Sequence, residues 1–434
     1  MTVPRVLFLA RTARGGSAFS LYHLAKGLDR HRYAPVVAFY ALEQAHIADQ
    51  LKAAQIPLEV LGNHFAAKAD GREAMHSSRP KRNWAGWLEA RFGRWASEAY
   101  RFFKSAYKFL KDDAPLIAPT MRLIRQTQPA LVHFNNGLRP SKPIAIAAWL
   151  MRKPMVCHVR SFEHLGWFDL LFRSLVGRFI YISRAVEQHS QRAGISAAHG
   201  QIIHNALEVA QYACSPAPAA EVRREFGWPA ETPLVGIVGR LDWWKGHEYF
   251  LQALAQAKQT IPSLRGLIIG EPEHTAENAA YYQKLLTLTE TLGLQNEVCF
   301  TGFRSDVPRL LAALDVMVLA SSEPEPFGRV VIEAMAAERP VIATAAGGVL
   351  DIIEHEVNGW LIPAKDAPAM AQAMVKMLSE PTLARRIGQA ARQTVEERFT
   401  LAVHVERVQK VYDGLLQAKS GAARPFSTAE GLSV

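Results

Sequence analysis

The chain has 434 residues, 49% of them hydrophobic and 21% charged, so it is long enough for two globular domains and lacks the composition of a disordered protein. No apolar run approaches the roughly 20 residues that a membrane-spanning helix needs. The net charge of +10 indicates anionic partners. Cys157, Cys214 and Cys299 lie far apart, with no metal-site or disulfide spacing, which predicts a reducing, cytoplasmic environment.

Residues 1–209 alternate short apolar runs with helical stretches, a pattern typical of a parallel sheet with crossover helices. We expect the apolar N-terminus to form the first strand, because it has no basic leader and no cleavage site. Strands are predicted near residues 4–10, 33–40, 57–62, 130–135, 154–160, 178–183 and 200–204.

Two places in this first domain have residues suited to a ligand. Gly15 and Gly16, with Ser17 as the expected cap of a helix over residues 18–28, would let a ligand approach the backbone after the first strand. His158 and Arg160 end a later strand, at the edge where open α/β sheets bind ligands. A plain turn and a structural histidine are the alternatives.

Residues 63–115 interrupt the alternation. From Lys68 to Lys111 there are eleven basic and four acidic residues, which accounts for +7 of the net charge. Aromatic residues recur at helical spacing from Trp84 to Leu110, which predicts an amphipathic basic helix or helix pair. Such a segment could lie on an anionic membrane, could bind nucleic acid, or could pack its aromatics on the domain with its charges solvated. We favour the membrane or a lipid-linked acceptor, and expect no nucleic acid.

A second domain follows a candidate linker. Residues 210–233 are rich in Pro and Ala and poorly periodic, which predicts the linker. Residues 234–400 repeat the α/β pattern, with strands predicted near 234–239, 266–270, 297–301, 315–320, 340–344 and 358–362. A last helix over 401–420 could return to the N-terminal domain, and residues 421–434 are predicted to be a disordered tail.

The strongest chemical signals lie in this second domain. Arg240 and Lys245 follow its first strand and precede a helix, an arrangement that suits a diphosphate. A Pro-rich turn then leads into a helix expected to begin at about Phe327, whose free N–H groups suit a phosphate. Glu325 and Glu333 are eight residues apart, so both could face one side of that helix. A nucleotide sugar, a phosphate flanked by neutral hydroxyls, would fit; solvated loop cations and surface glutamates are the structural alternative.

Together these residues resemble the GT-B fold retaining glycosyltransferases of family 4 (glycosyl transferases group 1). The resemblance covers most of the chain and is strongest across residues 234–363. It rests on Gly239-Arg240 with Lys245-Gly246, the run Gly302-Phe303-Arg304-Ser305-Asp306, the segment from Glu325 to Met335, and Gly347-Gly348 with Asn358-Gly359. Gly15-Gly16 and His158-Val159-Arg160 match more loosely, and Asn205-Ala206 departs from the Asn-Gly usual in the family. The resemblance implies an α/β fold with two Rossmann-like, doubly wound parallel-sheet domains that face each other across a cleft.

The resemblance also implies roles for residues. Arg240 and Lys245 would hold the donor diphosphate, Glu325 the sugar hydroxyls and Glu333 the ribose, while His158 would lie near the anomeric carbon. The implied catalytic residues are His158, Glu325, Arg240 and Lys245, with Arg160 on the acceptor side. The other implied donor-binding residues are Gly15, Gly16, Phe303, Arg304, Phe327, Gly328, Arg329 and Val330.

By the same resemblance, the reaction would retain the sugar's configuration, with the leaving phosphate accepting the acceptor's proton. A nucleotide-diphosphate sugar would be the donor, a carbohydrate or lipid-linked molecule the acceptor, and neither metal nor other cofactor would be needed. We expect a cytoplasmic protein, peripheral on the inner membrane face. A nucleotide-sugar epimerase, a phosphorylase and a non-catalytic GT-B scaffold for nucleotide sugar or membrane are the rival interpretations.

Overall fold

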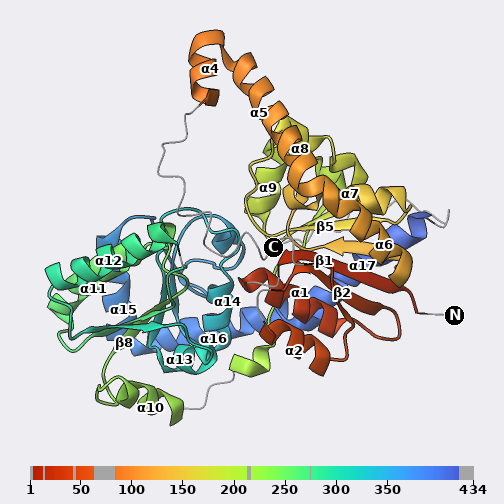
Figure 1. Cartoon of the computed structure of the whole chain (residues 1–434). Coiled ribbons are helices and arrows are strands. Elements are labelled where there is room, and N and C mark those ends of the chain that lie inside the picture. The colour runs from red at the N-terminus through yellow and green to blue at the C-terminus, as the bar shows by residue number, and fades with distance from the viewer. Residues whose placement is uncertain are drawn as a thin grey trace. The chain divides into compact units, whose positions relative to one another are not determined.

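The computed structural model describes residues 3–12, 15–42, 45–62, 84–212, 217–273 and 275–419. These residues form two compact units (Figure 1). Unit 1 contains the described residues up to Ile182, Val186–Ile203 and those from His404 onward; unit 2 contains Ser183–Ala185 and His204–Val403.

Unit 1 is built on a seven-stranded parallel sheet in the order β3-β2-β1-β4-β5-β6-β7. Its strands are β1 (Arg5–Thr12), β2 (Ala34–Ala41), β3 (Leu58–Val60), β4 (Leu131–Phe134), β5 (Met155–Val159), β6 (Arg178–Tyr181) and β7 (Gly200–Ile202). Helices α1 (Gly15–Gly27), α2 (Ala45–Ala53), α6 (Ile117–Thr127), α7 (Leu138–Leu150) and α9 (Arg184–Arg192) lie between them in sequence. The central strands are mostly apolar and mostly buried, as expected for a sheet covered on both faces. The strand order reverses between β1 and β4.

Unit 2 has a six-stranded parallel sheet in the order β10-β9-β8-β11-β12-β13. Its strands are β8 (Leu234–Val238), β9 (Arg265–Ile269), β10 (Val298–Gly302), β11 (Val316–Leu319), β12 (Val341–Thr344) and β13 (Trp360–Ile362). Its helices include α11 (His247–Thr260), α12 (Ala276–Thr291), α13 (Val307–Ala313), α14 (Arg329–Ala336), α15 (Ala367–Ser379) and α16 (Pro381–Arg398). Strands β8 and β11 and helices α11 and α15 enclose an apolar core. Here the strand order reverses between β8 and β11.

The two predicted series of strands are confirmed. Every predicted strand is present, and each end lies within two residues of its predicted position. The start of α1 was predicted wrongly: the helix begins at Gly15, so Ser17 lies inside its first turn and does not cap it. The Ser17 carbonyl instead accepts a hydrogen bond from the Asn135 side chain (2.7 Å).

The predicted linker is an ordered part of unit 2 wherever it is described. It contains the 3-10 turn Val209–Tyr212 and helix α10 (Ala217–Glu225). The buried Arg223 side chain donates to the Thr232 carbonyl (2.8 Å) and to Asp315 (2.9 Å) at the start of β11. Prolines mislead here because the first turn of a helix tolerates them.

The last helix, α17 (Leu401–Lys419), packs within unit 1 from His404 onward. The Tyr412 hydroxyl lies 2.6 Å from Nδ1 of His133 in β4. Asp413 accepts hydrogen bonds from Arg32 and from the Tyr33 hydroxyl, both at 2.6 Å. The tail predicted over 421–434 lies outside the described residues, as does Cys214.

The aromatic, basic segment contains the predicted helix pair, α4 (Trp84–Phe92) and α5 (Arg94–Lys108). Gly93, at a φ of 80°, makes the turn between them. A single π-helical turn, Phe109–Asp113, links α5 toward α6. Residues 63–83 lie outside the described part of the chain. None of the described helices combines the length and the hydropathy needed to cross a bilayer.

Candidate functional site

The reversal of strand order in unit 2 places two chemically rich loops at one sheet edge. One loop follows β8 and carries Arg240 and Lys245; the other follows β11 and carries Glu325. Open α/β sheets bind ligands at the carboxyl ends of the strands where the order reverses. Glycines keep these loops in close contact. A Cβ on Gly246 (φ 74°) would lie 1.9 Å from the Ala320 carbonyl oxygen, and one on Gly347 (φ 68°) would lie 2.1 Å from that of Glu325.

Lys245 and Glu325 form an ion pair at this edge. The ammonium nitrogen lies 2.6 Å from Oε1 of Glu325, and the Ser321 hydroxyl donates to the same oxygen at 2.6 Å. The Lys245 nitrogen also lies 4.1 Å from the ring centroid of Trp244. The side chains are only 18% and 6% exposed, so the pair is held in a fixed geometry with its cation near the surface.

Arg240 is more open and also engages carboxylates. One guanidinium nitrogen lies 3.0 Å from Asp242, and another contacts Glu273. The side chain is 55% exposed. A diphosphate at this edge would therefore meet two cations that are already neutralised by nearby acids, and it would have to compete for them.

The helix that was predicted to begin at about Phe327 starts two residues later. Gly328, in the left-handed conformation (φ 92°), is the N-cap, and α14 begins at Arg329. Glu325 lies before the helix and pairs as an isolated parallel bridge with Gly347, so only Glu333 belongs to α14 itself. The Phe327 ring is buried and packs near His204 and Phe399, which leaves only its backbone for a ligand.

Glu333 is paired within its own helix. The Arg329 Nε donates to Oε1 of Glu333 (2.8 Å), one turn earlier in α14. Tyr212, from the turn that precedes α10, is a neighbour of both, and burial raises the pKa of its hydroxyl. Arg329 thus neutralises Glu333. Val330 lies beside this pair in the first turn of the helix and is half-buried.

In the turn after β10, the side chains of Phe303 and Arg304 have different surroundings. Phe303 is 72% exposed. The guanidinium of Arg304 donates to both oxygens of Asp306 (2.7 Å each) and to Glu225 in α10 (2.6 Å). The bonds from Arg304 lower the pKa of Asp306 to about 2. Arg304 is therefore occupied with the turn itself, whereas Phe303 presents an open ring.

In unit 1, the predicted His158 and Arg160 belong to a buried polar cluster. Arg160 donates to Nδ1 of His158 (3.2 Å) and to the Asn135 side chain (2.8 Å). Because a guanidinium only donates, Nδ1 accepts, and the neutral ring carries its proton on Nε2. That Nε2 has no hydrogen-bond partner in the described part of the chain. Burial, together with the charge of Arg160, holds the pKa of His158 well below its usual value.

Sequence reasoning missed the neighbours of this histidine. The ring of His133 lies 5.4 Å from that of His158, and the His404 ring stacks on it at 6.0 Å. His133 and Asn135 lie at the end of β4, beside β5, so the same sheet-edge rule could have found them. Nothing local to α17 indicates that His404 packs here.

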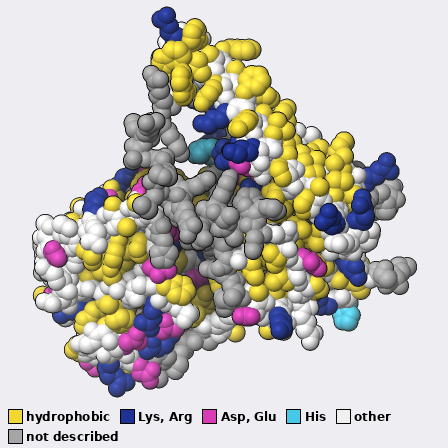
Figure 2. All heavy atoms as spheres, in the orientation of Figure 1, with side chains coloured by type: hydrophobic (Ala, Val, Ile, Leu, Met, Phe, Trp, Pro, Cys, Tyr) yellow, Lys and Arg dark blue, Asp and Glu magenta, His cyan; other side chains and the backbone are white. Residues whose placement is uncertain are grey.

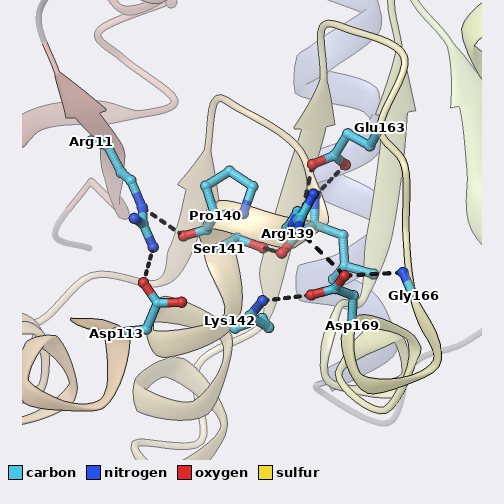
Figure 3. Close-up of polar contacts among 10 residues, drawn as sticks. Arg11, Asp113, Arg139, Pro140, Ser141, Lys142, Glu163, Gly166 and Asp169 are labelled. Carbon is cyan, nitrogen blue, oxygen red and sulfur yellow. Dashed lines mark hydrogen bonds and ion pairs between the residues drawn. The ribbon is translucent and has the colours of Figure 1, made fainter. Parts of the chain in front are cut away.

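A second polar network of unit 1 surrounds the start of α7 (Figure 3). The Glu163 carboxylate accepts hydrogen bonds from the first backbone N–H groups of the helix, at Leu138 (2.7 Å) and Arg139 (3.1 Å). Burial nevertheless raises the pKa of Glu163 to about 7. Lys142 forms a buried ion pair with Asp169 (2.5 Å), which ties α7 to the short helix α8 (Trp167–Leu170).

The same network reaches the aromatic segment. Arg11, at the end of β1, forms an ion pair with Asp113 and donates to the Pro140 carbonyl (3.1 Å) (Figure 3). The base of the α5 segment is therefore fixed to the sheet edge. Gly15 and Gly16 begin α1 shortly after Arg11. In the described part of the chain, no three His, Cys, Asp or Glu side chains converge in a way that could hold a metal ion.

Comparisons with known proteins show which proteins this chain is similar to. Residues 219–394 match the family model described as glycosyl transferases group 1. EpsD of Bacillus subtilis is 37% identical over 204 residues, which cover 46% of this chain and 51% of EpsD. N-acetyl-alpha-D-glucosaminyl L-malate synthase of Bacillus anthracis is 36% identical over 202 residues, covering 46% and 51%. The chain thus spans about half the length of these curated relatives.

Solved structures extend the similarity to both units. Crystal structures of HepE from Anabaena, in complex with UDP and with UDP-glucose, match with a TM-score of 0.75 at 26% identity. The match covers 94% of this chain and 99% of HepE. The chain therefore has the GT-B fold, and its residues 219–394 are similar to the glycosyl transferases group 1 family.

Proposed function

We propose that this protein is a retaining, metal-independent glycosyltransferase that moves a sugar from a nucleotide-diphosphate sugar to an acceptor hydroxyl. The observation that carries the proposal is the Lys245–Glu325 pair at the strand-order reversal of unit 2, with Arg240 on the same loop. A cation beside a carboxylate suits a ligand in which phosphate adjoins hydroxyl groups. HepE, which shares the fold, is known in complex with UDP-glucose.

Catalysis then follows from where charge develops. As the bond to the sugar breaks, negative charge grows on the leaving diphosphate, and fixed donors aimed at it lower the barrier. Lys245 and Arg240 supply two cations. The backbone N–H groups of Gly328, Arg329 and Val330, at the start of α14, supply hydrogen-bond donors for the diphosphate. Gly15 and Gly16 offer a similar helix start in unit 1. No step in this scheme requires a metal ion.

The carboxylates and the open ring recognise the rest of the donor. Glu325 accepts bonds from sugar hydroxyls while Lys245 holds it in place, and Glu333 does the same for the ribose with the support of Arg329. Phe303 stacks on the base, since its ring is exposed. We assign Arg304 to holding this turn, because its guanidinium is already bonded to Asp306 and Glu225.

The state of His158 supports transfer on one face of the sugar. Its Nδ1 already accepts a bond from Arg160 and its ring is buried, so we propose that His158 orients Arg160 beside the acceptor and does not serve as a base. The proton of the acceptor hydroxyl then goes to the leaving phosphate. Glu325 is a poor nucleophile for double displacement, because Oε1 already accepts bonds from Lys245 and Ser321.

We place the acceptor with unit 1, where Arg160 and His158 lie, and propose a lipid-linked or polysaccharide acceptor. An anionic membrane surface would be a partner through residues 63–115, whose basic residues outnumber the acidic ones. The protein would then work in the cytoplasm, peripheral to the inner face of the membrane.

The test is a calorimetric and thermal-shift screen against nucleotide diphosphates and their sugars, in the presence of EDTA. A ligand at about 100 times its dissociation constant should stabilise the fold by about 2.7 kcal/mol. Transfer to an acceptor, with the product's anomeric configuration read by NMR, completes the assay. No binding across the panel refutes the proposal; binding without transfer to any acceptor favours the scaffold, and an altered free nucleotide sugar favours the epimerase.

A further inference from the structure

The pair α4–α5 concentrates exposed apolar surface in one part of unit 1. Eighteen large hydrophobic residues are exposed among the described residues, and seven of them lie within the stretch from Trp84 to Leu110. Figure 2 shows hydrophobic side chains over much of the visible face of the segment that Figure 1 labels α4 and α5. A patch of this kind on a folded domain marks an interaction site.

The exposed large hydrophobic residues of α5 and the turn after it form a single stripe. Trp95, Phe103, Tyr107 and Leu110 follow one another at intervals of eight, four and three residues, which brings them to one side of the helix and its π-helical turn. Trp95 is 87% exposed, and the other three side chains are between 66% and 70% exposed. Ala99 lies midway between Trp95 and Phe103 on the same side.

This stripe is not the face by which α5 joins the domain. That face carries Phe102 and Phe109, whose rings lie 5.5 Å and 5.7 Å from the ring of Phe168 in α8. The buried Lys142–Asp169 pair anchors α8 in turn. Since α5 already has a packed side, its exposed stripe is additional apolar surface.

Helix α4 adds a small aromatic cluster. Trp84 and Trp87 meet edge to face with ring centroids 5.7 Å apart, and Trp87 meets Phe92 in the same way at 6.0 Å. All three side chains are exposed. Tryptophan and tyrosine are the residues enriched at membrane–water interfaces.

Cations accompany the stripe. Lys104, Lys108 and Lys111 recur at helical spacing and are exposed, and none has an ion-pair partner among the described residues. Uncompensated charge of one sign suits an anionic surface. It also favours lipid over protein, because lysine is depleted in protein–protein interfaces whereas an amphipathic basic helix with aromatic residues is typical of the headgroup layer.

We propose that α4–α5 form a peripheral anchor on anionic bilayers, in which Trp95, Phe103, Tyr107 and Leu110 enter the headgroup layer and the three lysines contact lipid phosphates. The anchor deepens the proposed function by fixing which face of residues 63–115 meets the membrane. Its binding does not need a donor, so the two proposals can fail separately.

The test uses the full-length protein in flotation with phosphatidylcholine vesicles, with and without phosphatidylglycerol. The variant Phe103→Ser/Tyr107→Ser/Leu110→Ser should lose flotation, while Trp149→Ser, another exposed tryptophan in unit 1, should not. Lys104→Gln/Lys108→Gln/Lys111→Gln should weaken binding by about fivefold for each lysine. Its matched control, Lys52→Gln/Arg122→Gln/Arg125→Gln, removes the same charge from exposed positions of α2 and α6.

Brominated lipids measure how deeply the tryptophan side chains enter the bilayer. They should quench tryptophan emission on binding, and Trp95→Phe should reduce that quenching. Circular dichroism melts of each variant check the fold, and calorimetry with the nucleotide checks the donor site, which the variants should leave unchanged. Equal flotation of wild type, the serine triple variant and the Lys104/Lys108/Lys111 variant would overturn the proposal. Flotation that does not depend on phosphatidylglycerol would also overturn it. The same holds if the serine variant floats like wild type and differs only in self-association, measured by light scattering, or in RNA binding.

Discussion

Replacing Glu325 by glutamine tests the central feature of the donor site, since it removes one charge and almost no volume. In the protein, the carboxylate neutralises the Lys245 ammonium at 2.6 Å. A phosphate oxygen bound to the other side of that ammonium would lie about 5 Å from the carboxylate, given ordinary hydrogen-bond lengths. At an effective dielectric constant of about 20, two unit charges at that distance repel by about 3 kcal/mol.

Salt and the intervening ammonium screen part of this repulsion, so we expect Glu325→Gln to bind a free nucleoside diphosphate about tenfold more tightly. The nucleotide sugar should gain less or lose affinity, because sugar hydroxyls then meet a neutral amide in place of a carboxylate, a difference of about 1 kcal/mol. Isothermal titration calorimetry of both ligands at two salt concentrations measures the two shifts.

Glu323→Gln is the matched control. It removes the same charge two residues away, from a half-exposed side chain that pairs with Lys365 at 3.1 Å. The control should leave both affinities within twofold of wild type. If Glu325→Gln leaves diphosphate affinity unchanged, or lowers both affinities equally, Glu325 does not compete with the phosphate for Lys245, and the assigned roles are wrong.

Three further changes have defined outcomes. Lys245→Ala should weaken nucleotide binding by about 1–3 kcal/mol in calorimetry, as expected for a lost hydrogen bond to a charged group; wild-type affinity would remove Lys245 from the site. Glu163→Gln should flatten the pH dependence of stability. The folded pKa of about 7 exceeds the ordinary 4.5, so wild type loses up to about 3 kcal/mol of stability relative to the variant as pH rises from 4.5 to 7. The same difference in melting temperature between wild type and variant at every pH would contradict this. Gly246→Ala should lower the melting temperature and nucleotide affinity together, because the added carbon meets the Ala320 carbonyl; an unaltered melt would show that the loop can move aside.

The sheets could be read from sequence because their strands are short, apolar and separated by amphipathic stretches. The sheet edge that carries Arg240 and Glu325 was predicted in the same way, since both residues lie in the segments that follow predicted strands. The helix pair over 84–108 was also evident, because aromatic residues at helical spacing leave little choice of structure. Each of these inferences rests on neighbours in sequence.

The failures have the opposite origin. Lys245 and Glu325 are 80 residues apart, and no local pattern indicates that the two expected ligand-binding charges would meet each other. The start of α14 depends on Gly328 in a left-handed conformation, where an added Cβ would lie 3.3 Å from Val349, which is distant in sequence. Helix α10 was obscured by its prolines, although the buried Arg223 side chain inside it pairs with Asp315.

The return of α17 to unit 1 has a consequence for the order in which the protein can mature. A ribosome delivers His133 and Tyr33 long before their partners Tyr412 and Asp413, with all of unit 2 synthesised in between. Unit 2 has its strands in one continuous piece and can fold while the nascent chain grows. Unit 1 must wait with those polar groups unmatched until α17 has been synthesised, so the packing of unit 1 is completed after the whole of unit 2 has left the ribosome.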